Sequence, residues 1–207
     1  MVKLTKVERD ALMEITNMFS QHISMTMGKL TGGPVDLKVL NKDIVSLDKK
    51  ETDAEKEPVM HLGIYSNIQK GDLEGNILLA FPKDSALNLY DALKKRRTTS
   101  TKIVNEDVKN TLGEIGNMVA GKVLGILNKF LGVDAWHSVP TVVPSFGSQI
   151  YDYVFFDLKK DSEHAILIEI DTRFNIGKNE ISGQSILLLT HKSFKTLLKI
   201  INEKVKE

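Results

Sequence analysis

The chain has 207 residues, and its 28 Lys and Arg nearly balance its 27 Asp and Glu, which argues against a nucleic-acid partner. It contains no cysteine, so disulfides, thiolate nucleophiles and zinc–thiolate sites are excluded. With 42% hydrophobic residues, but no apolar run of about 18 residues and no secretory signal, the composition predicts a globular cytoplasmic protein without a membrane partner.

Two segments of the chain repeat one another at an offset of 100 residues. DALMEITN at 10–17 and NTLGEIGN at 110–117 share a leucine, a glutamate, an isoleucine and an asparagine at matching positions. Each segment opens an apolar stripe with the spacing of an amphipathic helix that buries one face. The first stripe consists of Leu12, Ile15, Phe19, Ile23 and Leu30, and the second of Val108, Leu112, Ile115, Val119, Val123, Ile126 and Phe130. Gly32 and Gly132 then supply a stop, so two long, related helices are predicted.

Each long helix is followed by strands and a shorter helix. Strands are predicted at 61–65, 76–81, 135–143, 149–156, 165–170 and 185–190. Shorter helices are predicted at 83–95 and 192–202, a solvated loop or hairpin end at 42–57 and a linker at 94–100. Because each half alone has little core to bury, we expect one pseudo-symmetric domain over 1–207, with halves at about 1–100 and 101–207.

The repeated polar residues lie opposite the apolar stripe. At about 100° per residue, Glu114 and Asn117 are on the outward face of the second helix, with Asn110 as a neighbour. Small residues that leave a shallow track for a second protein are predicted on the same face: Gly113, Ala120 and Gly121. A glycine inside a helix costs about 1 kcal/mol relative to alanine, so stability alone does not explain Gly113, Gly116, Gly121 and Gly125.

A Glu and an Asn on the solvent side of a helix are ordinarily no more than solvated side chains. Here the pair occurs in both halves and in the same register to the core stripe, although neighbouring positions such as Met13 and Gly113 differ. Surface positions without a task diverge readily, so the retained pair favours a function. The corresponding residues of the first half are Asp10, Glu14 and Asn17.

These residues resemble the CheC/CheX/FliY family of response-regulator phosphatases. The family motif is an Asp or Ser, three residues, Glu, two residues, Asn and, after a longer spacer, a Pro. The second copy has Glu114, Asn117 and Pro140 at the motif spacing but Asn110 where the family has an Asp or Ser. The first copy has Asp10, Glu14 and Asn17 but Leu40 at the proline position. GEIGNMVAG, GNILLAFPKDSA and ISGQSILLLTHKSFKTLL also look like family segments, so the resemblance covers nearly the whole chain. Two motif copies are more similar to CheC than to CheX, which carries one.

The resemblance implies an α/β (α+β) fold with internal two-fold pseudosymmetry. Its antiparallel sheet would carry two long motif-bearing helices and two shorter helices. The implied activity is removal of the phosphoryl group from the aspartate of a phosphorylated CheY-like response regulator in chemotaxis signalling. No cofactor of its own is expected, because Mg²⁺ is bound by the regulator.

The resemblance also assigns roles to the motif residues. Asn17 or Asn117 would orient a water in line with the aspartyl–phosphorus bond, which lowers the entropic barrier to hydrolysis. Glu14 or Glu114 would anchor the regulator by pairing with its active-site lysine. The partner-binding residues would be Asp10, Asn110, Gly113, Ala120 and Gly121. Of the two sites, we expect the Asn117 site to be at least as active as the other.

Two alternatives stay open from the sequence. A non-enzymatic binding module of the chemotaxis or flagellar-switch system would share the fold and bind the phosphorylated regulator or a CheD-like deamidase. The Glu and Asn in both copies favour the enzyme, because an adaptor does not need them. A small-molecule enzyme is disfavoured because the sequence has no convergent acid, base and nucleophile, and its five histidines lack metal-ligand spacing.

Overall fold

The computed structural model describes residues 4–32, 35, 38–46, 59–95, 101–146, 149, 165–176 and 179–205. Its helices are α1 (Lys6–Thr31), α2 (Lys83–Leu93), α3 (Glu106–Leu131) and α5 (His191–Lys204). Its strands are β1 (Lys38–Ser46), β2 (Met60–Gly71), β3 (Gly75–Pro82), β4 (Ala135–His137), β5 (Thr141–Phe146), β6 (Ala165–Ile176) and β7 (Asn179–Thr190). The fold is therefore a mixture of helices and strands, as predicted.

The two long helices begin and end in the same way. Each has 26 residues, and each begins with a side chain that accepts a hydrogen bond from the first turn. Thr5 Oγ1 accepts from a backbone N–H at 3.2 Å, and Asn105 Oδ1 accepts from another at 3.0 Å. Both helices end at a glycine with positive φ, 73° at Gly32 and 72° at Gly132. Local sequence signals therefore account for both long helices.

The strands form one antiparallel sheet to which both halves of the chain contribute. The strand order is β1-β6-β7-β3-β2-β4, and β5 also pairs with β2. The central pair is β3 with β7, one strand from each half. β6 lies next to β7, and β2 lies next to β3. Beyond them, β1 pairs with β6 in the place that β4 and β5 take beside β2.

The register of the central pair shows where the pseudo-two-fold axis passes. α2 follows β3 directly and α5 follows β7 directly, and their first residues, Lys83 and His191, are 108 positions apart. Leu78 and Ile186, which are paired across β3 and β7, are also 108 positions apart. Equivalent residues of the two halves therefore face each other at this pair, so the axis runs between them.

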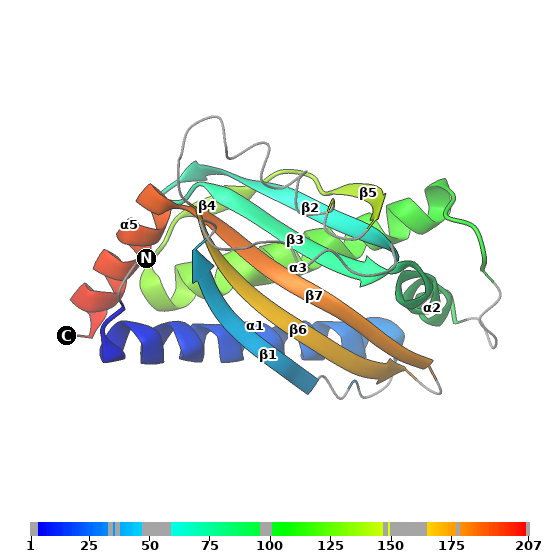
Figure 1. The fold of residues 1–207 in the computed structure, drawn as a ribbon, viewed down its shortest axis with the longest axis horizontal. Helices are drawn as coiled ribbons and strands as arrows, with labels where there is room; N and C mark the ends of the chain where they lie inside the picture. The colour runs from blue at the N-terminus through cyan, green and yellow to red at the C-terminus, as the bar shows by residue number, and fades with distance from the viewer. Residues whose placement is uncertain are drawn as a thin grey trace.

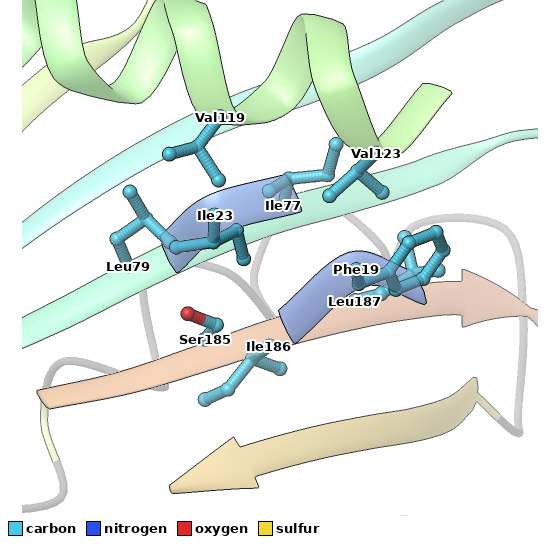
Figure 2. Close-up of a pocket in the computed structure, with 9 residues that line it drawn as sticks. All are labelled: Phe19, Ile23, Ile77, Leu79, Val119, Val123, Ser185, Ile186 and Leu187. Atoms are coloured by element: carbon cyan, nitrogen blue, oxygen red, sulfur yellow. The ribbon is translucent and has the colours of Figure 1, made fainter. Parts of the chain in front are cut away.

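The core lies where α1 and α3 cover one face of the sheet. Figure 1 shows these helices beside each other, with α2 and α5 at opposite ends of the molecule. A small apolar cavity of about 20 Å³ remains between both helices and the central strands. Its lining, shown in Figure 2, consists largely of equivalent pairs from the two halves: Phe19 and Val119, Ile23 and Val123, Ile77 and Ser185, Leu79 and Leu187. It is too small for an organic ligand and offers one hydroxyl, so it is a packing gap at the pseudosymmetry axis.

Several predicted boundaries differ from the structure. The loop predicted at 42–57 is wrong over 42–46, which belong to β1, because this polar edge segment pairs with β6. The single strand predicted at 135–143 is interrupted at 138–140, where Pro140 has no N–H for a ladder hydrogen bond. Phe130 is 44% exposed, with the Lys129 ammonium above its ring, and is therefore not part of the core.

Other predicted elements lie partly or wholly outside the described residues. These are residues 47–57 of the predicted loop, residues 150–156 of the predicted strand and residues 96–100 of the predicted linker. The remaining predicted strands and the shorter helices are found, with the strands β2, β6 and β7 longer than predicted.

Candidate functional site

The motif of the second half lies in an open groove between α3 and the connection from β4 to β5. Asn110, Glu114 and Asn117 are all exposed on one side of α3, because their spacing of four and three residues places them one turn apart. The opposite wall is formed by the segment from Val139 to Val142. The groove therefore presents a carboxylate and two carboxamides to solvent beside a wall from the edge of the sheet.

A close contact between helix and sheet shapes this groove. Gly116 is buried beneath the motif, and a Cβ built on it would overlap Cγ2 of Ile64 and lie 3.3 Å from Cβ of Pro140. Only a residue without a side chain lets α3 approach β2 and Pro140 this closely. This close contact explains why one of the four helix glycines, Gly116, is needed. The contact also sets the position of the wall opposite Asn117.

The polar pair of the groove has no partner within the described part of the chain. Neither Glu114 nor Asn117 makes a hydrogen bond or an ion pair there. Glu106 and Lys109, at the same groove, neutralise one another through an ion pair of 2.7 Å. An unpaired carboxylate and an unpaired carboxamide are available to a ligand or a partner protein.

Apolar side chains flank the polar pair. Val139 is 85% exposed and Met118 is 39% exposed, and both line the groove. Neither residue is distinguished by the sequence pattern. Met118 follows Asn117 directly, and Val139 precedes Pro140, but an exposed valine cannot be told from a buried one by strand propensity alone.

Gly113 lines the groove as expected, with the Val142 side chain 3.9 Å from the position of a Cβ. Gly121 is exposed and lies beside His137, one turn beyond the residues that form the groove. The prediction that Ala120 is on the exposed face is wrong, because Ala120 is fully buried. α3 packs against α1 as well as against the sheet, so its buried face is wider than the apolar stripe indicates.

The first copy of the motif has different surroundings. Asp10 and Glu14 are exposed, but Asn17 is half-buried and already has an interaction partner within the protein. Thr16 occupies the position of Gly116, and its hydroxyl donates to the carbonyl of Leu12 at 2.7 Å. The two copies therefore share a sequence motif but differ in the exposure of the asparagine.

The position that matches Pro140 also differs in backbone structure. Leu40 lies in β1 at an irregularity of the ladder between Val39 and Asn41. Val39 itself is paired with Thr172 of β6. The segment equivalent to the wall of the α3 groove is thus part of the sheet in the first half.

Neither a metal site nor a membrane span is found in the described ranges. No group of three His, Asp or Glu residues is arranged to hold a metal ion there. Within those same residues, no helix combines the length and apolar character needed to cross a bilayer.

The family model described as chemotaxis phosphatase CheX matches residues 67–159. The CheY-P phosphatase CheC of Bacillus subtilis (strain 168) is 24% identical over 193 residues, which cover 92% of this chain and 91% of that protein. These sequence matches span both halves of the repeat, and the first includes the second motif copy.

Solved structures show the same fold. The crystal structure of Thermotoga maritima FliY matches with a TM-score of 0.72 at 17% identity, over 98% of this chain and 100% of that chain. A chain of the H. pylori FliM–SpeE complex matches with a TM-score of 0.67 at 12% identity, over 98% of both chains. CheX from Desulfovibrio desulfuricans matches with a TM-score of 0.54 at 16% identity, over 84% of this chain and 99% of that chain.

Proposed function

We propose that this chain, which is similar in sequence to the CheX family model and to a CheC protein, dephosphorylates the phospho-aspartate of a CheY-like response regulator. The observation that carries the proposal is the exposed, unpaired Glu114 and Asn117 in an open groove beside Pro140. The curated relative over most of the chain is a CheY-P phosphatase, which supports the same activity.

The proposed reaction is hydrolysis of an acyl phosphate. The oxygen of water attacks phosphorus, the bond from phosphorus to the aspartate oxygen breaks, and inorganic phosphate and the aspartate carboxylate are released. The Asn117 carboxamide binds the attacking water and holds it in line with the breaking bond. A neutral amide is sufficient, because the loose transition state of phosphoryl transfer needs little proton abstraction.

Glu114 and Asn110 contribute to docking in this proposal. Glu114 pairs with the lysine of the regulator's active site and so fixes the register of α3 over the phosphoryl group. Asn110 and Gly113 contact the regulator at the same face. The Mg²⁺ that neutralises the phosphoryl oxygens is carried by the regulator, and this chain supplies position rather than charge.

The second candidate function is a binding module of the chemotaxis or flagellar-switch system. The fold match to FliM structures favours it, since two of them are complexes, with SpeE and with FliG. Such a module would bind the phosphorylated regulator or a CheD-like deamidase without hydrolysis. Both candidates place the protein with its partners in the cytoplasm.

The test follows the decay of a phosphorylated CheY-type regulator from the same organism. We expect wild type to accelerate the decay, Asn117→Ala to lose about a hundredfold of that acceleration because the water is no longer oriented, and Asn17→Ala to retain most of it. Lys122→Ala is the control, since Lys122 is exposed on α3 outside the groove. Binding without acceleration by wild type would refute the phosphatase and support the binding module.

A further inference from the structure

Val139 is the most exposed large hydrophobic residue among those described. Single exposed hydrophobic residues are common and need no explanation by themselves. Val139, however, is at the wall of the groove that holds the motif, opposite Glu114 and Asn117. Its exposure therefore places an apolar group where a docking partner would meet the site.

The backbone on both sides of Val139 is held in place. Ser138 donates its N–H to the carbonyl of Asn67 at 2.8 Å, and its hydroxyl accepts from the Asn67 N–H at 3.1 Å. On the other side, Pro140 has a restricted φ and packs on Gly116 of α3. A side chain presented by an ordered backbone loses little conformational freedom when it is buried by a partner.

The groove offers few unpaired charges to a partner. Glu106 and Lys109 compensate each other, which leaves Glu114 as the unpaired charge among the residues that line the groove. Met118 adds a second partly exposed apolar side chain next to Asn117. The polar pair is therefore flanked by apolar groups, an arrangement that excludes water around a docked polar contact.

The first half of the chain lacks this arrangement, although it has a valine at the equivalent position. Val39 is paired with Thr172 within the sheet, whereas 138–140 lie outside the ladder between β4 and β5. Pro140 and Gly116 are replaced by Leu40 and Thr16. The break in the strand ladder at 138–140 is thus a feature of the α3 groove that the equivalent segment of the first half does not share.

We propose that Val139 is the apolar anchor for the phosphorylated regulator at the α3 groove, and that it determines affinity without taking part in the hydrolysis. The occupant is an apolar patch beside the phospho-aspartate of the regulator. This inference rests on the proposed function, because it assigns the partner's contact at the same site. Gly116 and Pro140 act as positioning residues, since they set where Val139 stands relative to Asn117.

The test measures the decay rate over a range of regulator concentrations for wild type and Val139→Ser. We expect the half-saturating concentration to rise about tenfold, from the loss of two buried methyl groups, with the maximal rate unchanged. The control is Val205→Ser, because Val205 is also exposed, at 58%, but lies at the end of α5. Because Val139 is solvent-exposed, its replacement should leave the unfolding curve unchanged.

A separate binding measurement distinguishes this inference from the proposed function. Calorimetric titration with a beryllofluoride-loaded regulator, a stable mimic of the phosphorylated form, should give a weaker affinity for Val139→Ser by the same factor. If wild type does not accelerate decay but Val139→Ser still weakens binding, the phosphatase proposal fails and the anchor stands. Unchanged affinity, or a reduced maximal rate at unchanged half-saturation, would overturn the anchor. A change in oligomeric state of Val139→Ser would instead assign this face to a second copy of the chain and also overturn it.

Discussion

Replacing Gly116 by alanine tests how the groove is built. A methyl group at this position would overlap Cγ2 of Ile64, which is fully buried in β2, and would lie 3.3 Å from Cβ of Pro140. Overpacking of this kind costs about 1–3 kcal/mol. Alanine in a helix interior contributes about 1 kcal/mol relative to glycine. The net expectation is a loss of up to about 2 kcal/mol in the free energy of unfolding.

Gly125 provides the matched control on the same helix. It is exposed, and a Cβ built on it meets no atom within 4 Å. Gly125→Ala should therefore stabilise the protein by about 1 kcal/mol through helix propensity alone. Urea unfolding followed by circular dichroism measures both variants, and the difference between them isolates the cost of the contact.

The same pair of variants has a functional readout. The added methyl at 116 displaces Pro140 and the wall that carries Val139, so Gly116→Ala should lower the acceleration of phospho-regulator decay about tenfold or more. Gly125→Ala should retain wild-type activity. Equal stability and equal activity of the two variants would show that the close approach of α3 to β2 is not what shapes the site.

Two further predictions concern the groove and the helix ends. Pro140→Leu introduces the residue of the first copy and should reduce the acceleration of decay about tenfold, because the wall loses its restricted backbone. The same change should alter the free energy of unfolding by less than about 1 kcal/mol. An unaltered decay rate would contradict this role of Pro140. Glu8→Gln should lower the unfolding free energy by about 1 kcal/mol at neutral pH, because Glu8 accepts hydrogen bonds from the Thr5 backbone N–H at 2.8 Å and from Asn202 at 2.8 Å. The Thr5 backbone contact, followed by Asn202, lowers the pKa of Glu8, so the difference between the variants should be complete above the ordinary carboxyl pKa and disappear as the pH falls through the lowered one. A difference that persists in strong acid, in melts recorded across this range, would contradict that assignment.

The helices of this protein are determined largely by local sequence. Caps at Thr5 and Asn105, glycine stops at Gly32 and Gly132, and a periodic apolar stripe all act within a few residues of one another. The same periodicity placed Glu114 and Asn117 on an exposed face, and the structure shows both exposed. A motif read against a helical period is therefore a sound guide to which side chains reach solvent.

Other features depend on contacts between distant parts of the chain. Residues 42–46 form part of strand β1 through pairing with β6, more than 100 positions later, although they begin a stretch rich in charged residues. Ala120 is fully buried because α3 packs against the sheet as well as against α1, and no pattern within α3 records these contacts. The break at 138–140 combines the missing N–H of Pro140 with the hydrogen bonds of Ser138 to Asn67. Each of these requires the register of the sheet to be known.

The sequence by itself determined the repeat, the two long helices, the sheet-rich halves and the Glu and Asn pair that recurs on each long helix. Only the tertiary structure decided that the pairs are not equivalent. In α3, the absence of a side chain at Gly116 lets Pro140 approach and leaves Asn117 exposed beside Val139. In α1, Asn17 is half-buried and engaged. The physical reason is that a helical period sets the direction of a side chain, whereas its surroundings are set by segments brought alongside through strand pairing and helix packing.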